Sequence, residues 1–86
     1  MTQELTFTVK RGYSQKDQCY KYGIMKDGKL YENTTLFGKR NADLVAELFN
    51  LMDALIMDRD NGMMQVLQII RIDKERYNNG KVERRS

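Results

Sequence analysis

The 86-residue chain contains no histidine, no proline and a single cysteine, and each scarcity excludes something. Without histidine the commonest general base is missing, and with one thiol the chain cannot assemble an ordinary zinc site. The lone thiol, Cys19, cannot form an internal disulfide, which favours a reducing cytosol. The carboxylates are scattered, without the pairing that acid–base catalysis needs. The sequence therefore predicts a protein that is not an enzyme and that needs no cofactor or metal.

Linkers and long apolar runs are lacking as well. With no proline and scattered glycines, we expect one domain over residues 1–77 and a basic, flexible C-terminal tail over residues 78–86. The longest apolar stretches are interrupted by Asp53 or Gln68, so none could span a bilayer. The first four residues also lack the basic start and apolar run of a signal peptide. These features predict a cytoplasmic protein without a membrane partner.

The chain does have an excess of positive charge, and that charge is segregated. Residues 1–40 carry eight Lys or Arg against four Asp or Glu, a balance of +4. Residues 41–62 carry one basic residue against five acidic ones, a balance of −4. Residues 71–86 carry six basic residues against three acidic ones, a balance of +3. Such segregation indicates charged partners more than it indicates a fold.

The first half of the chain has the pattern of a β-sheet. Apolar and polar residues alternate over residues 3–10 and 18–26, as they do in half-buried strands, and residues 30–37 are predicted as the strand that returns beside the second. A polar loop at residues 11–17 joins the first two predicted strands. Asp27 and Gly28 join the last two, and this pair suits the positive φ angles of a type I′ hairpin turn. The pattern predicts a three-stranded antiparallel meander.

The second half begins with a predicted helix over residues 42–58, where apolar residues recur at helical spacing. Asn41 is suited to cap its start, and Asn61 with Gly62 is suited to stop it. Residues 64–73 fit a helix by spacing, but four β-branched residues within seven positions favour a fourth strand. The predicted fold is therefore α+β with the order βββαβ: the meander and a fourth strand, with one helix packed on the sheet.

The predicted helix is apolar over an arc of about 180°, whereas packing on one sheet requires about 100°. The surplus side carries Val45, Phe49 and Ile56, with Ala42 at its margin. Two occupants fit this side equally well. One is another chain, either a second copy, which would give a homodimer, or a different protein. The other is the C-terminal segment of the same chain.

Basic residues lie at the ends of several predicted elements. In FGKRNAD, residues 37–43, Lys39 and Arg40 precede the predicted helix, whose free N–H groups could hold a phosphate. The segment lacks the further residues of a Walker motif, so a solvated connection is the other interpretation. Clustered cations would release counterions from a nucleic-acid backbone, whereas interspersed ones would only keep the surface soluble. The predicted nucleic-acid-binding set is Lys10, Arg11, Lys39, Arg40, Arg71, Lys74, Arg76, Lys81, Arg84 and Arg85.

The tyrosines also have two interpretations. Exposed aromatic rings could stack on unpaired bases, and the candidates are Tyr13, Tyr20, Tyr22 and Tyr31 with Phe7. The spacing favours the second interpretation, in which Tyr20 and Tyr22 share the core face of the sheet with Ile24.

From MTQELTFTVKRGY at its start to KVERRS at its end, the chain resembles small early proteins of T4-like phages in size, basicity and lack of His and Pro. Among these it is most similar in character to the TifA-type inhibitors of host endoribonuclease toxins. The resemblance implies an RNA-assisted complex with a toxin in the host cytoplasm. No motif aligns residue for residue, so no site is transferred from that family.

Together these features predict a non-enzymatic, RNA-binding inhibitor of a host nuclease or toxin. Its predicted partners are RNA, a host protein such as a ribonuclease toxin, and a second copy of the chain. The alternative is a pure protein–protein interaction module that inhibits a host enzyme, such as a polymerase, through the acidic helix.

Overall fold

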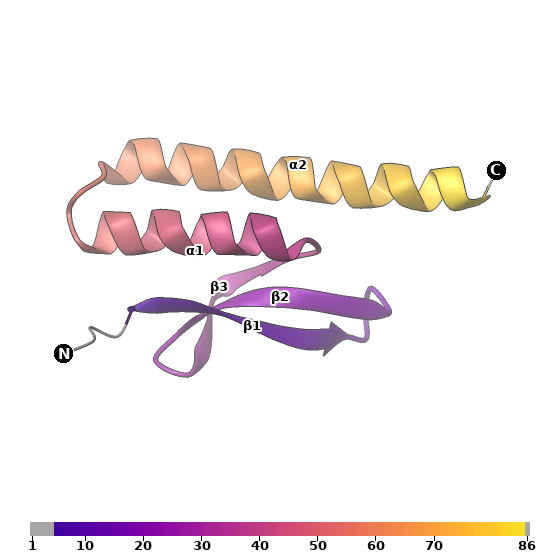
Figure 1. The fold of residues 1–86 in the computed structure, drawn as a ribbon, viewed down its shortest axis with the longest axis horizontal. Coiled ribbons are helices and arrows are strands. Elements are labelled where there is room, and N and C mark those ends of the chain that lie inside the picture. Colours follow the sequence, from indigo (N-terminus) through magenta and orange to yellow (C-terminus); the bar gives the residue numbers. More distant parts are fainter. Residues whose placement is uncertain (1–4, 86) are drawn as a thin grey trace.

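The computed structural model describes residues 5–85, and the side chains of residues 5–79. Within these residues the chain forms three strands and two helices: β1 (Phe7–Ser14), β2 (Cys19–Lys26), β3 (Lys29–Leu36), α1 (Lys39–Asp53) and α2 (Arg59–Arg85). The strands form an antiparallel sheet in the order β1-β2-β3. Figure 1 shows three layers, with α1 lying between the sheet and an antiparallel α2. The predicted α+β class is confirmed, but its order is βββαα.

The antiparallel meander is confirmed, although its first strand runs further than predicted. Residues 11–14, predicted as a loop, pair with residues 19–22 and extend the β1–β2 hairpin. The predicted start of this strand, at residues 3 and 4, lies outside the described residues. Asp27 and Gly28 have φ angles of 53° and 77°, both positive as a type I′ turn requires. The predicted turn between the second and third strands therefore forms.

The core lies between the sheet and α1. Phe7 is buried, and its ring centroid lies 4.9 Å from that of Tyr31 and 5.2 Å from that of Phe49. The side-chain amide of Asn50 fastens α1 to the start of β1. Its Oδ1 accepts a hydrogen bond from the Phe7 N–H at 2.9 Å, and its Nδ2 donates to the Phe7 carbonyl at 3.0 Å. Asn50 thus satisfies both backbone groups of a buried strand residue.

Burial in this core removes the surface that was predicted for a second copy. Ala42 and Val45 are 0% exposed and Phe49 is 5% exposed. Ile56 alone of the predicted set is exposed, and it lies in the turn after α1. The sheet covers one side of α1, and Val66 of α2 joins the same core from the other layer. The wide apolar arc is explained by two covering layers, which is the intrachain alternative.

Residues 64–73 belong to α2, so the predicted fourth strand is wrong. Val66 and Asp73 are both buried, and they are spaced at two helical turns. The β-branched residues favoured a strand by propensity, but packing on α1 outweighs that preference. The backbone of residues 78–85 continues the same helix. The mobility predicted for this tail stays a prediction.

Asp73 caps α1 from the neighbouring helix. α1 begins at Lys39, so Gly38 takes the N-cap position instead of the predicted Asn41, and glycine has no side chain to cap with. One oxygen of Asp73, Oδ2, accepts the Phe37 N–H at 2.7 Å. The other, Oδ1, accepts the Gly38 N–H and Asn41 Nδ2, both at 2.9 Å. The carboxylate therefore lies at the positive end of the helix dipole, where a negative charge is stabilising.

The connection between the helices also differs from the prediction. α1 ends early because Leu55 has a φ of 60°, a left-handed conformation that stops a helix. Asn61 and Gly62, predicted as the stop, lie in α2 instead, where the Asn61 N–H donates to Asp58 Oδ2 at 3.1 Å. Asp58 thereby caps α2. A Cβ at Gly62 would overlap the Met52 side chain, so this glycine allows the two helices to approach closely.

We expect Asp73→Ala to lower the free energy of unfolding by about 2–4 kcal/mol, because it removes the acceptor of three hydrogen bonds. In urea unfolding, the midpoint should fall while the m-value stays constant. Asp73→Asn should cost less, since it keeps one acceptor oxygen. Glu75→Ala is the matched control on the same helix, and its exposed side chain should change stability by less than about 1 kcal/mol. Equal midpoints for wild type and Asp73→Ala would contradict this capping role.

Candidate nucleic-acid interface

An exposed aromatic pair lies at the far end of the β1–β2 hairpin, beyond the start of α1 (Figure 1). Tyr13 and Tyr20 pair across the two strands, with ring centroids 5.3 Å apart and ring planes at 80°. They are 56% and 54% exposed. Tyr20 shares its strand face with the buried Ile24, as the alternation predicts, but α1 begins short of this end of the hairpin and does not bury it (Figure 1). The rings are therefore accessible for stacking.

Arg11 completes this aromatic cluster. Its guanidinium carbon lies 4.1 Å from the centroid of the Tyr20 ring, which is the geometry of a cation–π contact. Guanidinium planes and aromatic rings are the groups on which unpaired bases stack. The core interpretation is therefore confirmed for Tyr22, which packs against the core as Tyr31 also does, and it is wrong for the exposed Tyr20.

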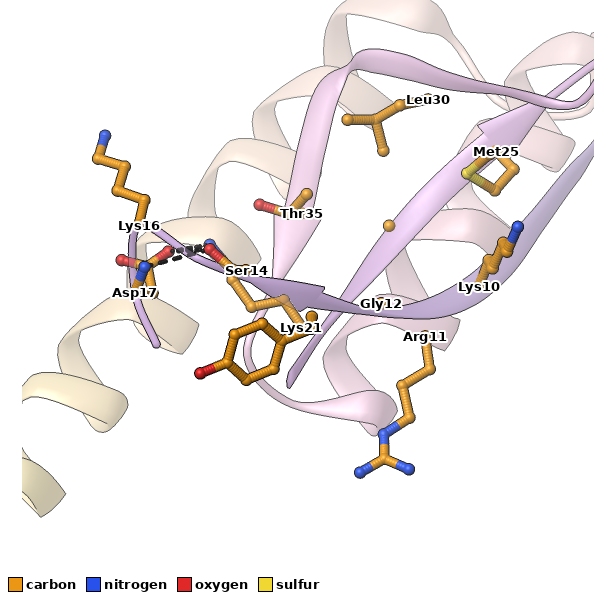
Figure 2. A pocket seen from close by; sticks show the side chains of 12 residues that line it. Lys10, Arg11, Gly12, Ser14, Lys16, Asp17, Lys21, Met25, Leu30 and Thr35 are labelled. Carbon is orange, nitrogen blue, oxygen red and sulfur yellow. Dashed lines mark hydrogen bonds and ion pairs between the residues drawn. The ribbon is translucent and has the colours of Figure 1, made fainter. Parts of the chain in front are cut away.

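The opposite face of the same hairpin is an open, basic groove of about 450 Å³. Lys10, Lys16 and Lys21 supply its amines, and Figure 2 shows Lys10 on β1 and Lys16 at the turn after it. The two glycines of the groove lining differ: Gly12 has no neighbour within 4 Å of where a Cβ would lie and leaves its strand bare, whereas Gly23 is buried under Leu30. We call the six basic and aromatic residues the hairpin cluster: Lys10, Arg11, Tyr13, Lys16, Tyr20 and Lys21.

Asp17 supplies the negative charge of the groove lining. Its Oδ2 accepts hydrogen bonds from Lys21 Nζ and Ser14 Oγ, both at 3.2 Å. The hydrogen bond from Lys21 is the main cause that lowers the pKa of Asp17, so this carboxylate is ionised at neutral pH. Arg11 also lines the groove, so four basic residues and one carboxylate give it a balance of +3. Lys10 and Lys16 have no salt-bridge partner among residues 5–79, so their charges are available.

The ten predicted cations are distributed over several surfaces instead of one. Lys10 and Arg11 belong to the hairpin cluster. Lys39 pairs with Asp43 at 3.0 Å, and it lines a second groove together with Arg11, between β1 and α1. Arg40 is exposed beside it.

The remaining predicted cations are on α2. Arg71, Lys74 and Arg76 are exposed, and Arg71 Nε donates to Glu75 Oε1 at 3.3 Å. The side chains of Lys81, Arg84 and Arg85 lie outside those that the structure describes. The structure therefore brings together only the first two predicted cations with the hairpin cluster, while Lys39 borders it.

The basic loop before α1 is already in contact with a carboxylate, that of Asp73 on α2. The N–H groups of Phe37 and Gly38, which could have bound a phosphate, donate to the carboxylate of Asp73. The side chains of Lys39 and Arg40 stay exposed, but these backbone donors are occupied. A negative charge therefore already lies at the start of this helix, where the predicted phosphate would bind.

Sequence reasoning did not select Lys16 and Lys21. Residues 11–17 have the composition of a polar loop, and only the observed pairing places Lys21 opposite Gly12. The available signal was the continued alternation of side chains after residue 10, which could have extended the first strand.

No protein-family model matches the chain, and no curated protein or solved structure is significantly similar to it. Within residues 5–85, no helix has both the length and the apolar character that crossing a membrane requires. The same part of the chain contains no group of three or more His, Cys, Asp or Glu placed to hold a metal ion. The charge and ring geometry of the hairpin cluster is thus the main indication of function.

We expect the carboxyl group of Asp17 to titrate below the ordinary aspartate pKa of 3.8, because Lys21 stabilises its charged form. Lys21→Met should raise the pKa of Asp17 towards that value. The measurement is an NMR titration of the Asp17 carboxyl carbon. Lys10→Met is the control, since Lys10 makes no contact with this carboxylate and its removal should leave the titration unchanged. Identical curves for wild type and Lys21→Met would contradict the assignment.

Proposed function

We propose that the protein binds single-stranded RNA through the hairpin cluster and catalyses no reaction. The observation that carries this proposal is the position of Arg11 over the exposed ring of Tyr20, beside Tyr13 and directly behind a groove lined by lysines. Rings and guanidinium groups bind unpaired bases by stacking, and amines bind the phosphates between them. The β1–β2 hairpin carries aromatic rings and a guanidinium group on one face and lysine amines on the other.

The edge position of β1 suits this mode of binding. β1 is an outer strand of the sheet, so an RNA strand can cross it and contact both faces. Bases would stack on the face that carries Tyr13 and Tyr20, while phosphates would meet Lys10 and Lys16 on the other. Stacking and charge have little base preference, so we expect binding of many single-stranded sequences.

The finer function that we propose is inhibition of a host nuclease or toxin, with bound RNA contributing to the complex. The resemblance to small phage proteins supports this part, and the RNA-binding surface is compatible with it. The alternative is a protein interaction module that uses the acidic helix. A groove of about 760 Å³ between β1 and α1 supports that alternative, because Asp43 and Glu47 line it beside the apolar Leu51.

Charge reversal tests the electrostatic part of the proposal. Lys10→Glu with Lys16→Glu should weaken binding of unrelated single-stranded RNAs. The log–log dependence of affinity on salt should become shallower by about 0.7 for each phosphate that the variant no longer neutralises. Fluorescence anisotropy of a labelled RNA at several salt concentrations gives both quantities.

The matched control is Lys29→Glu with Arg59→Glu, which changes the charge equally. Lys29 begins β3 and pairs with Lys26, at the end of β2 far from the cluster, and Arg59 lines a pocket beside Lys26. This pair should retain nearly the wild-type salt slope. If both double variants lose affinity equally, net charge and not the hairpin governs binding. If the wild type binds no RNA, the protein-only alternative is favoured.

Tyr20 tests the stacking part separately. Tyr20→Ala should reduce RNA affinity by about 1–3 kcal/mol, because it removes a stacking surface and the support of Arg11. The salt slope should change little, since no charge is removed. Tyr20→Phe keeps the ring and should bind like the wild type. An equal loss in both variants would show that the hydroxyl, and not stacking, matters.

A further inference from the structure

Helix α2 carries apolar side chains on two faces. Val66 is buried in the core, and Met63 and Ile70 pack against it. Other apolar side chains of the same helix are largely exposed: Met64 is 68%, Leu67 61% and Ile72 45% exposed. A surface helix with a single covered face normally has one apolar stripe and a polar remainder. The second apolar face of α2 therefore calls for a partner.

This outward face has an ordered arrangement of charge. Asp60, Met64, Gln68, Ile72 and Arg76 are spaced four residues apart, so they form one continuous row along the helix. All five side chains are exposed. The row has an acidic end and a basic end, with apolar residues on both sides of the central glutamine. Its middle section borders a shallow depression of about 420 Å³ on the helix surface.

We propose that a second copy of the chain packs its α2 antiparallel on this row, forming a two-fold symmetric dimer. With the axis at Gln68, each Met64 faces Ile72 of the other copy. Each Asp60 then faces Arg76 of the other copy, so both ends of the contact pair opposite charges. Rows with four-residue spacing interdigitate in helix packing, and a two-fold contact requires such self-complementarity.

The opposite charges at the two ends of the row favour a second copy of α2 as the partner and favour an antiparallel orientation. In a parallel pairing, Asp60 would face Asp60 and Arg76 would face Arg76, and like charges would oppose association. The antiparallel pairing of two identical rows removes both conflicts. This surface is separate from the α1 surface predicted from sequence, which is buried. It is also separate from the hairpin cluster, so this proposal does not depend on RNA binding.

The mass of the full chain in solution tests the proposal. Sedimentation velocity at micromolar concentrations and without RNA should show a dimer. Met64→Lys with Ile72→Lys should give a folded monomer that unfolds cooperatively in urea with a midpoint independent of protein concentration, because both side chains are exposed within one chain. A wild-type monomer at the highest concentration, or a persistent dimer in the variant, would overturn the proposal.

Charge exchange tests the antiparallel register. Asp60→Arg and Arg76→Glu, taken singly, should each weaken the dimer about tenfold, because two symmetry-related pairs are broken. The double variant Asp60→Arg with Arg76→Glu should restore wild-type affinity, since the pairs are re-formed with exchanged signs. Failure of the double variant to recover would rule out this register.

Cross-linking locates the axis independently. In a Cys19→Ser background, Gln68→Cys should form a disulfide-linked dimer on oxidation, because the two copies of this position meet at the axis. Lys74→Cys is the matched control, since this residue is exposed on α2 but lies off the row. Equal cross-linking at both positions would contradict the proposed interface.

Discussion

The buried carboxylate of Asp73 is the contact on which the arrangement of the two helices depends. It accepts hydrogen bonds from the turn between β3 and α1, and so joins α2 to the point where the sheet ends and the first helix begins. One turn further along α2, the ring of Tyr77 stacks on Phe37 with centroids 3.8 Å apart and planes at 6°. These contacts hold α2 on the outer side of α1 and determine its rotation about its own axis.

That rotation decides which residues remain for other molecules. Because Val66 and Asp73 face inward, Gln68 at the centre of the row faces outward, and the other four residues of the row are also exposed. The same carboxylate also occupies the backbone donors in front of α1. The N–H groups of Phe37 and Gly38 in the basic loop thus bind a carboxylate of the same chain. Exposed positive charge remains on the β1–β2 hairpin, at Lys10, Arg11 and Lys16, and on the outer side of α2.

The hairpin shows how strand pairing sorts a mixed sequence into two surfaces. Residues of the stretch from Lys10 to Lys21 alternate between the faces, so Arg11 and the two exposed tyrosines share one face while the amines line the other. Gly12 leaves the backbone bare on the basic face, and Gly23 allows Leu30 to pack on it. A covering helix would hide one of these surfaces, but α1 begins too far along the sheet to do so (Figure 1).

Local sequence was sufficient for the strand alternation, the turn at Asp27 and Gly28, the α+β class and the excess of positive charge, because each depends on neighbouring residues. It also placed Lys10 and Arg11 in the candidate interface. Tertiary structure determined that residues 64–73 form a helix. Their β-branched side chains favour a strand by propensity, but packing against α1 stabilises the helix. The cap from Asp73 lies 35 residues from Gly38, and no local pattern can report an acceptor that reaches its donors only after the chain has folded.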